Sequence, residues 1–281
     1  MSILSPTAGP PPSSPETRHS AIVFEEVAIA FEDKQVLDGI SFALARGETK
    51  VLLGISGSGK STILKMVLGL VKPDQGKIFV LGHEVSQMKE EDLFGLRANL
   101  GIVFQESALF DSLTVRENVA FRLMEERNIP QEEIERRVRE TLRFVELEHT
   151  LDLMPTELSG GMQRRVGLAR AMISRPEILL YDSPTAGLDP VTSTHIDELI
   201  VKQRDLYHHS ALLVSHRLQD AFLMAAYYFD ADTNQMRPLE PGSARTANTT
   251  FLMLHDGAVI FDGTAAELAQ SQDPYIRNYI S

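Results

Sequence analysis

The sequence has no cysteine and no long apolar run, and each absence narrows what the protein can be. Without cysteine there is no disulfide framework and no thiolate metal site. The longest apolar runs, such as residues 66–68 and 178–180, are far short of the roughly 18 residues that indicate a membrane-spanning helix. Residues 1–20 contain no apolar stretch of the kind found in a signal peptide. We therefore expect a cytoplasmic protein.

Positive charge is also in deficit, with 27 Lys and Arg against 39 Asp and Glu and a net charge of −12. Proteins that bind nucleic acid usually carry a basic surface, so this balance argues against DNA or RNA as a partner. It also disfavours direct attraction to anionic lipid headgroups. If the chain works at a membrane, we expect another protein to hold it there.

The chain of 281 residues is long enough to form one α/β domain with a large core. Residues 1–20 are rich in proline and serine and are predicted to be disordered, because they offer little apolar surface to bury. Ordered structure is expected from about Ala21. Four short apolar segments are predicted to be buried strands. They are residues 51–53, 102–104, 178–181 and 212–215.

Two helices are predicted from the spacing of their apolar residues, one over about 60–70 and one over 131–144. On the second helix, glutamate and arginine recur four positions apart and are expected to form ion pairs on its solvated face. The expected pairs are Glu132–Arg136, Glu133–Arg137 and Glu135–Arg139.

Residues 54–61 match G-x-x-x-x-G-K-[ST] and lie between a predicted strand and a predicted helix, which is the context that a phosphate-binding P-loop requires. The glycines let backbone N–H groups surround a phosphate, and the helix presents its positive end to the anion. This predicts bound ATP with Mg²⁺. The residues expected to contact them here are Gly54, Ser56, Gly57, Ser58, Gly59, Lys60, Ser61 and Thr62.

Asp182 directly follows the predicted strand 178–181, and a carboxylate in this position suits Mg²⁺. A strand that ends in Asp is weak evidence alone. Together with the P-loop, whose Ser61 hydroxyl is a second metal ligand, it indicates a nucleoside triphosphatase.

Residues 158–163, Leu-Ser-Gly-Gly-Met-Gln, open a predicted helix between the P-loop and Asp182, and they resemble the LSGGQ signature of ABC ATPases. Other motifs of that family also have counterparts here. Gln105 resembles the Q-loop glutamine, residues 186–189 the D-loop, His216 the switch histidine, and Phe31 the aromatic residue that stacks on adenine.

This resemblance covers residues 21–281 and implies an α/β fold: a RecA-like P-loop core, an N-terminal antiparallel β part and a helical subdomain over about 104–170. It also implies a head-to-tail homodimer that holds two ATP molecules. In such a dimer, Ser159, Gly160 and Gly161 bind the γ-phosphate on the partner's Lys60. Gln105 would contact Mg²⁺, and it would act in catalysis together with His216, Asp189 and the residue at position 183.

A narrower resemblance is to the ATPases of Mce-associated lipid transporters of the Mla type. It rests on residues 107–121, 153–157 and 273–280. It implies transmembrane permease subunits, an Mce-type lipid-binding protein, and a location at the inner face of the cytoplasmic membrane. The alternative is that these residues are shared with amino-acid importers or drug exporters. A translation or DNA-repair ATPase is disfavoured by the single ATPase unit, the lack of sustained heptads and the negative charge.

Three features depart from the family pattern or fall outside it. Ser183 replaces the usual glutamate that activates water, which favours slow hydrolysis or an ATP-dependent switch with little hydrolysis. Residues 227–250 form an insertion, read either as an exposed excursion or as a hairpin that contacts a partner. His208 and His209 are adjacent, lack nearby ligands, and are expected to be a solvated pair rather than a metal site.

Overall fold

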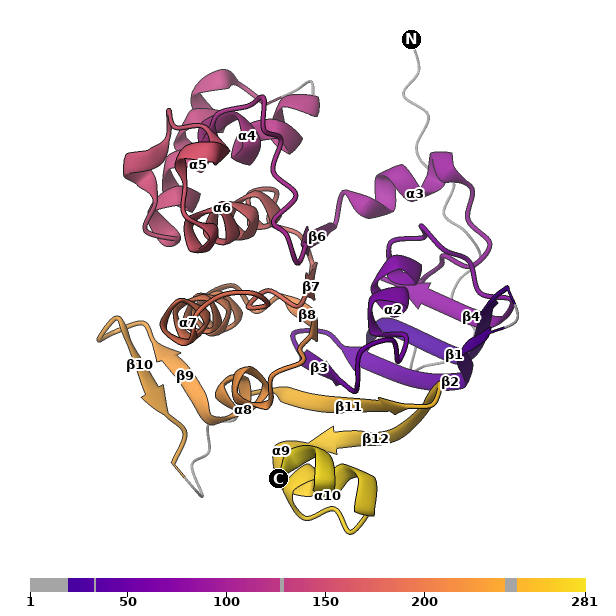
Figure 1. The fold of residues 1–281 in the computed structure, drawn as a ribbon. Helices are drawn as coiled ribbons and strands as arrows, with labels where there is room; N and C mark the ends of the chain where they lie inside the picture. The colour runs from indigo at the N-terminus through magenta and orange to yellow at the C-terminus, as the bar shows by residue number, and fades with distance from the viewer. Residues whose placement is uncertain (1–19, 33, 127–128, 241–246) are drawn as a thin grey trace.

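The computed structural model describes residues 20–32, 34–126, 129–240 and 247–281, which form a six-stranded sheet, a four-stranded sheet and a two-stranded hairpin with surrounding helices (Figure 1). The predicted disorder of residues 1–19 lies outside the described residues. At Ser20 that prediction was wrong, because Ser20 begins strand β1 and pairs with Ala45.

A six-stranded sheet forms the centre, in the order β12-β11-β3-β8-β7-β6. Its strands are β3 (Thr49–Leu53), β6 (Leu100–Val103), β7 (Ile178–Asp182), β8 (Ser210–Val214), β11 (Thr249–His255) and β12 (Ala258–Thr264). All neighbours are parallel except β11 and β12. Successive residues face opposite cores: Leu213 packs with α-helices on one side, whereas Leu212 and Val214 pack toward the second sheet.

The second sheet is antiparallel, in the order β2-β1-β4-β5. Its strands are β1 (Ser20–Phe31), β2 (Lys34–Ala45), β4 (Gln75–Val80) and β5 (His83–Glu84). Helix α2 (Lys60–Val67) shares its core, and α3 (Glu90–Arg97) follows. Helix α2 is shorter than predicted because Gly69, with φ of +66°, turns the chain away beside Leu93. The predicted α/β fold with an antiparallel part is confirmed.

A group of helices lies next to the β6 edge of the central sheet (Figure 1). It contains α4 (Val115–Glu125), α5 (Gln131–Phe144), the short 3₁₀ turns η1 (Glu148–Thr150) and η2 (Pro155–Glu157), and α6 (Gly160–Met172). Its apolar residues belong to the same core as one face of the central sheet. The side of the sheet that bears α4, α5 and α6 is therefore packed continuously with the rest of the domain.

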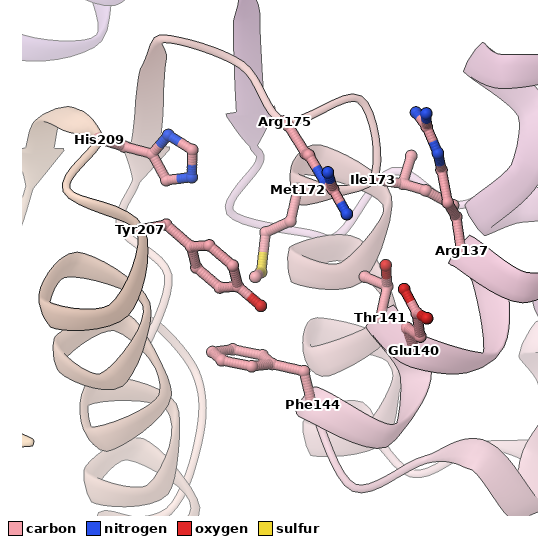
Figure 2. Close-up of a pocket in the computed structure, with 9 residues that line it drawn as sticks. All are labelled: Arg137, Glu140, Thr141, Phe144, Met172, Ile173, Arg175, Tyr207 and His209. Atoms are coloured by element: carbon pink, nitrogen blue, oxygen red, sulfur yellow. The ribbon is translucent and has the colours of Figure 1, made fainter. Parts of the chain in front are cut away.

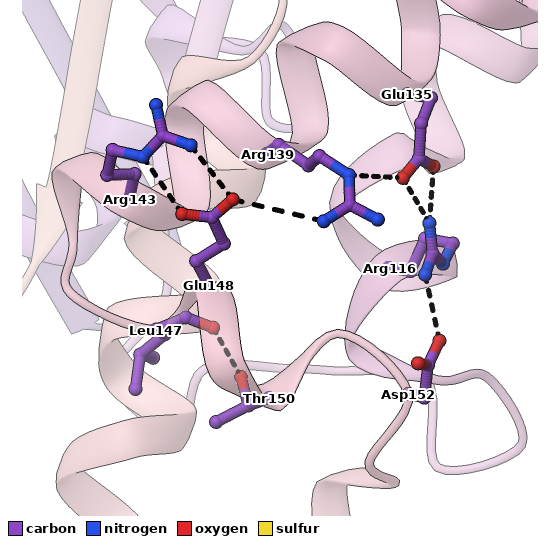
Figure 3. Close-up of polar contacts among 8 residues, drawn as sticks. All are labelled: Arg116, Glu135, Arg139, Arg143, Leu147, Glu148, Thr150 and Asp152. Atoms are coloured by element: carbon purple, nitrogen blue, oxygen red, sulfur yellow. Dashed lines mark hydrogen bonds and ion pairs between the residues drawn. The ribbon is translucent and has the colours of Figure 1, made fainter.

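Ion pairs tie the outer surface of this helical group together (Figure 3). Arg116 of α4 pairs with Glu135 of α5, which also pairs with Arg139 as predicted. The predicted pair Glu133–Arg137 is present as well. The predicted Glu132–Arg136 pair was wrong, because the Arg136 guanidinium binds Glu133 and Glu140 instead.

Helices α7 (Pro190–Tyr207) and α8 (Leu218–Ala226) cover the other part of this face (Figure 1). Within the predicted insertion at 227–250, strands β9 (Tyr227–Asp230) and β10 (Gln235–Pro238) form an antiparallel hairpin, whereas Thr249 and Thr250 already belong to β11 and residues 241–246 lie outside the described residues. The chain ends in α9 (Ala265–Ala269) and α10 (Pro274–Ile280). Among the described residues, no helix combines the length and apolar composition that crossing a membrane requires.

Candidate functional site

The predicted site residues follow parallel strands of the central sheet, and the carboxyl ends of parallel strands meet at one edge. Loop 54–61 follows β3, Asp182 ends β7, and His216 lies two residues beyond β8. Because β8 lies between β3 and β7, His216 stands between the loop and Asp182. Gln105 is exposed, two residues beyond β6, which ends one residue earlier than we predicted.

The backbone of loop 54–61 requires glycine at two of its positions. Gly54 has φ of +141°, and a Cβ there would stand 2.5 Å from the carbonyl oxygen of Leu254. Gly59 has φ of +95°, and a Cβ there would meet Leu37 of β2 at 2.6 Å. Gly59 is also the N-cap of α2 and supplies no side-chain cap. The N–H groups of the first turn of α2 are therefore available to an anion.

Lys60 is buried, and its ammonium group is held over the loop. Its Nζ donates to the carbonyl oxygens of Gly54 and Ile55, each at 2.8 Å, and lies 3.2 Å from Ser58 Oγ. Burial lowers the pKa of Lys60 to about 8, while the Asp182 carboxylate works in the opposite direction. A bound phosphate would be a negatively charged partner for this ammonium group and would favour its protonated form.

Ser61 and Asp182 come together across the domain. Ser61 Oγ donates to Asp182 Oδ1 at 3.1 Å. A hydroxyl and a carboxylate oxygen at this separation are ligands of the kind that Mg²⁺ accepts together with phosphate oxygens and water. The described residues contain no group of three His, Cys, Asp or Glu side chains that could hold a metal alone. This pair therefore suits a metal that arrives with a nucleotide.

His216 is exposed toward this edge, and its charge state is set by its surroundings. Partial burial of the ring lowers the pKa of His216, the Lys60 ammonium lowers it further, and the Asp182 carboxylate partly opposes them. The imidazole is therefore neutral at pH 7, with one nitrogen free to accept a hydrogen bond and one able to donate.

Ser183 occupies an unusual position next to Asp182. It is buried, its φ of +50° lies in the left-handed region, and its Oγ has no hydrogen-bond partner. Its backbone N–H donates to the carbonyl oxygen of Val214 at 3.0 Å. A buried hydroxyl without a partner is uncommon in folded proteins and marks a place where a ligand or water can bind.

Asp189 does not point freely into the site, because it caps helix α7. Its carboxylate accepts from the N–H groups of Val191 and Thr192, both at 3.0 Å, and from Thr192 Oγ1. The hydrogen bonds from Thr192 hold the pKa of Asp189 below its usual range. In this state Asp189 is a helix cap, and a role with water would require these bonds to open.

The signature residues form the exposed start of α6, as predicted. Ser159 is the N-cap and accepts from Met162 N–H at 3.3 Å, while Gly160 is exposed and Gly161 half-buried beside Thr192. Within the part of the chain that the structure describes, no hydrogen bond joins them to loop 54–61. Phe31, at the end of β1, is 47% exposed. In a single chain, the signature residues and Phe31 are thus both exposed.

Arg164 was missed by the sequence analysis. It is buried in α6 and donates from Nη1 to the carbonyl oxygen of Phe104 at 2.9 Å and from Nη2 to that of Ala186 at 3.3 Å. It thereby joins the segment of Gln105 to the segment before Asp189. The sequence did contain a signal for its burial, because Arg164 lies on the same apolar face of the helix as Leu168 and Ala171.

A small cavity of about 60 Å³ lies away from this site, where α5 and the end of α6 approach the end of α7 (Figure 2). Tyr207 and His209 line it with Phe144. His208 is exposed, but His209 is half-buried, and burial lowers its pKa. The prediction that both histidines are solvated was therefore wrong for His209, whose ring lies beside Tyr207.

The strand–loop–helix of residues 54–61 and the facing Asp182 define a P-loop nucleoside triphosphatase. A model of the ABC transporter family matches residues 37–186, more than half of the chain. The chain belongs to this family, and it is an ATP-binding subunit whose class couples ATP hydrolysis to transport.

Proteins similar to this chain include an ATP-binding protein of a phospholipid transport system. It is 37% identical over 262 residues to TRIGALACTOSYLDIACYLGLYCEROL 3 of Arabidopsis thaliana, covering 90% of this chain and 71% of the relative. It is 31% identical over 241 residues to the intermembrane phospholipid transport ATP-binding protein MlaF of Haemophilus influenzae, covering 86% and 83%. Methionine import protein MetN of Carboxydothermus hydrogenoformans is 37% identical over 70% of this chain and 59% of the relative.

Solved structures agree with the fold. A dimeric ATP-binding cassette in a post-hydrolysis state, bound to ADP and Pi, matches with a TM-score of 0.70 and 27% identity over 86% of this chain and 98% of that one. The cbiO1 protein of Clostridium perfringens, part of the ABC transporter complex cbiONQ, matches with a TM-score of 0.75 and 26% identity over 92% and 94%. The predicted family and fold are confirmed.

Proposed function

We propose that this chain powers lipid transport of the Mla/Mce type, as an ATPase that acts on separate membrane subunits. The observation that carries the proposal is its similarity to MlaF, which is named for phospholipid transport, over 86% of this chain. The similarity to TRIGALACTOSYLDIACYLGLYCEROL 3, which is named for a lipid, extends over 90%. The MetN similarity extends over 70% of the chain. The alternative is therefore that the same ATPase powers the import of methionine or a similar amino acid.

At the nucleotide, Lys60 and the N–H groups of loop 54–61 bind the β- and γ-phosphates, and Phe31 stacks on adenine. Ser61, Asp182 and Gln105 would hold Mg²⁺, which neutralises phosphate charge when bound. The facing oxygens of Ser61 and Asp182 support this assignment. The uncapped start of α2, led by Gly59, supports the phosphate assignment.

The ATP site is completed by a second copy of the chain. Ser159, Gly160 and Gly161 sit at an exposed helix start that no hydrogen bond connects to the P-loop of the same described chain. A helix start attracts the γ-phosphate. We infer a head-to-tail homodimer in which each Lys60 shares ATP with the partner's signature. The match to a cassette solved as a dimer supports dimerisation. ATP binding closes the dimer, and hydrolysis reopens it.

Hydrolysis proceeds with neutral His216 and with Gln105 orienting the attacking water. Ser183 offers a hydroxyl where a glutamate would act as general base, and a hydroxyl is far less basic. The reaction is therefore slow. Ser183 Oγ is buried without a hydrogen-bond partner and supplies no general base. This favours a second candidate function, an ATP-dependent switch with little hydrolysis. In that case closure by ATP, rather than turnover, controls the membrane subunits.

The membrane subunits dock on a groove next to Gln105. A cavity of about 270 Å³ lies between β6 and helices α4 and α6, lined by Phe104, Phe110, Phe121, Arg122 and Arg170 among others. The three phenylalanines are 37–43% exposed. An amphipathic helix of a permease fits such an apolar groove with basic side chains beside it. Movement of the helical group would then move the permease.

The proposal is tested by reconstitution with candidate permease subunits and an Mce-type protein. Expected results are co-purification of the complex, bound phospholipid, and ATP hydrolysis stimulated by phospholipid. Lys60→Ala in the same complex should remove the stimulation. A complex that responds to an amino acid and not to lipid would overturn the cargo class and leave the ATPase assignment intact.

A further inference from the structure

Asp220 is a buried carboxylate in the first turn of α8, directly after the segment that carries His216. No role was predicted for it from the sequence. Strands β7 and β8 are neighbours, so the segments that follow them run side by side into this region. One of those segments holds Asp182 and Ser183, and the other holds His216.

The Asp220 carboxylate contacts both segments. Thr185 Oγ1, from the segment after β7, donates to Asp220 Oδ2 at 2.5 Å. Ser215 Oγ, from the segment after β8, lies 3.2 Å from the same oxygen. Arg217 Nε lies 3.5 Å from Oδ1 on the other side of His216. Thr185, Ser215 and Asp220 are all at most 3% exposed.

Asp197 of α7 is a second buried carboxyl group, and it interacts electrostatically with Asp220. Burial and a neighbouring negative charge both disfavour the ionised form of a carboxyl group. Burial and the charge of Asp220 raise the pKa of Asp197 to about 9. Asp197 therefore keeps its proton at pH 7.

We propose that Asp220 is a positioning residue for ATP hydrolysis: it fixes the His216 segment against the Asp182–Asp189 segment and does not itself touch the nucleotide. Hydrogen bonds in a buried, low-dielectric setting are strong and directional. Because both segments donate to the same oxygen of Asp220, a displacement of the segment after β7 also displaces the segment that carries His216. This inference rests on the proposed roles of His216 and Asp182.

The test compares variants of the full chain by steady-state phosphate release at saturating Mg-ATP, ATP affinity and thermal midpoint. Thr185→Val removes the hydroxyl, and Thr185→Ser keeps it. We expect the valine variant to lose about 10- to 100-fold in kcat, as misplaced catalytic groups do, with ATP affinity little changed and the serine variant close to wild type. Asp220→Asn should show the same loss in kcat.

Asp205→Asn is the matched control, since this carboxylate lies on α7 and accepts from Phe229 N–H in the hairpin region. It should lower the thermal midpoint without lowering kcat. If Asp220→Asn does not fold, a double-mutant cycle with Thr185→Val, Ser215→Ala and the double variant tests the proposal instead. Their effects on kcat should be non-additive, and independent effects that multiply to within about twofold would overturn the proposal.

Failure of the proposed function gives a different result. If this site does not hydrolyse ATP, Lys60→Ala leaves phosphate release unchanged. If Lys60→Ala removes hydrolysis while Thr185→Val and Asp220→Asn retain wild-type kcat, the ATPase assignment stands and the positioning role of Asp220 is wrong.

Discussion

Ser61 Oγ and Asp182 Oδ1 lie 3.1 Å apart although the two residues are separated by 121 positions in the chain. Strands β3 and β7 flank β8, and the shared sheet edge brings these two oxygens together. The pair has the composition of a shared metal site, because both oxygens can bind one Mg²⁺ beside a triphosphate.

Asp182→Asn should weaken Mg²⁺ binding, so that hydrolysis requires a higher Mg²⁺ concentration. Loss of a charged ligand interaction costs about 1.5–3 kcal/mol, so the Mg²⁺ concentration for half-maximal activity should rise about 10- to 100-fold. Phosphate release titrated with Mg²⁺ at fixed ATP measures this change. Asp189→Asn is a useful comparison, since Asp189 caps α7 in this structure. An unchanged Mg²⁺ midpoint in Asp182→Asn would contradict the metal assignment.

Lys60→Ala should weaken ATP binding by about tenfold or more, because it removes the charge facing the phosphates. Isothermal titration calorimetry measures the affinity directly. Lys65→Ala is the matched control, since Lys65 is an exposed lysine on the same helix α2. Equal affinities in Lys60→Ala and Lys65→Ala would remove Lys60 from the nucleotide site.

Ser159→Asp should abolish ATP-dependent dimerisation while leaving the monomer folded. Aspartate caps helices as well as serine does, but its charge would repel the partner's γ-phosphate. Ser159→Asn supplies a neutral cap and should dimerise with ATP. Light scattering with ATP and with ADP distinguishes the variants. A dimer of Ser159→Asp that forms as readily as wild type would sink the shared-site geometry.

Ser183→Glu should accelerate hydrolysis, because a carboxylate beside Mg²⁺ can orient and partly deprotonate water. A positioned general base contributes about 10²–10⁴-fold. Ser183→Ala, which also lacks a base, should stay near the wild-type rate. Steady-state phosphate release compares all three proteins. Equal rates for serine and glutamate would show that this position does not limit hydrolysis.

Asp197 should make the protein less stable as the pH rises. Its pKa is raised to about 9 by burial, then by Asp220, with Arg217 opposing and Glu198 adding a smaller rise. Between the ordinary pKa of 3.8 and the raised pKa of about 9, the folded chain holds a proton that the unfolded chain has lost. The stabilising contribution is complete below that window and is lost through it.

Asp197→Asn cannot titrate at this position, so wild type should lose stability relative to the variant from pH 5 to pH 9. Urea unfolding midpoints across this range measure the difference. Glu198→Gln, on the same helix, is the control and should follow the wild-type slope. Parallel pH profiles for wild type and Asp197→Asn would show that Asp197 is not protonated in the fold.

Much of the site was predictable because its signals are local. Residues 54–61 specify a strand, a tight loop and a helix within a few positions, and Ser159 is a helix cap that needs only its own neighbours. The range of α5 was predicted correctly for the same reason, from its apolar spacing. The Glu132–Arg136 pair failed because several acceptors compete for one guanidinium.

The sequence by itself determined the family, the P-loop chemistry and the serine at position 183, because these depend on residue type and short spacing. Tertiary structure alone decided that Ser61 meets Asp182, that Asp189 is engaged as a cap, and that Asp220 joins two segments. Parallel strands are paired through long crossovers, so strand order, which no local pattern encodes, fixes which side chains meet. Burial then sets their charge, as it does for Lys60 and Asp197.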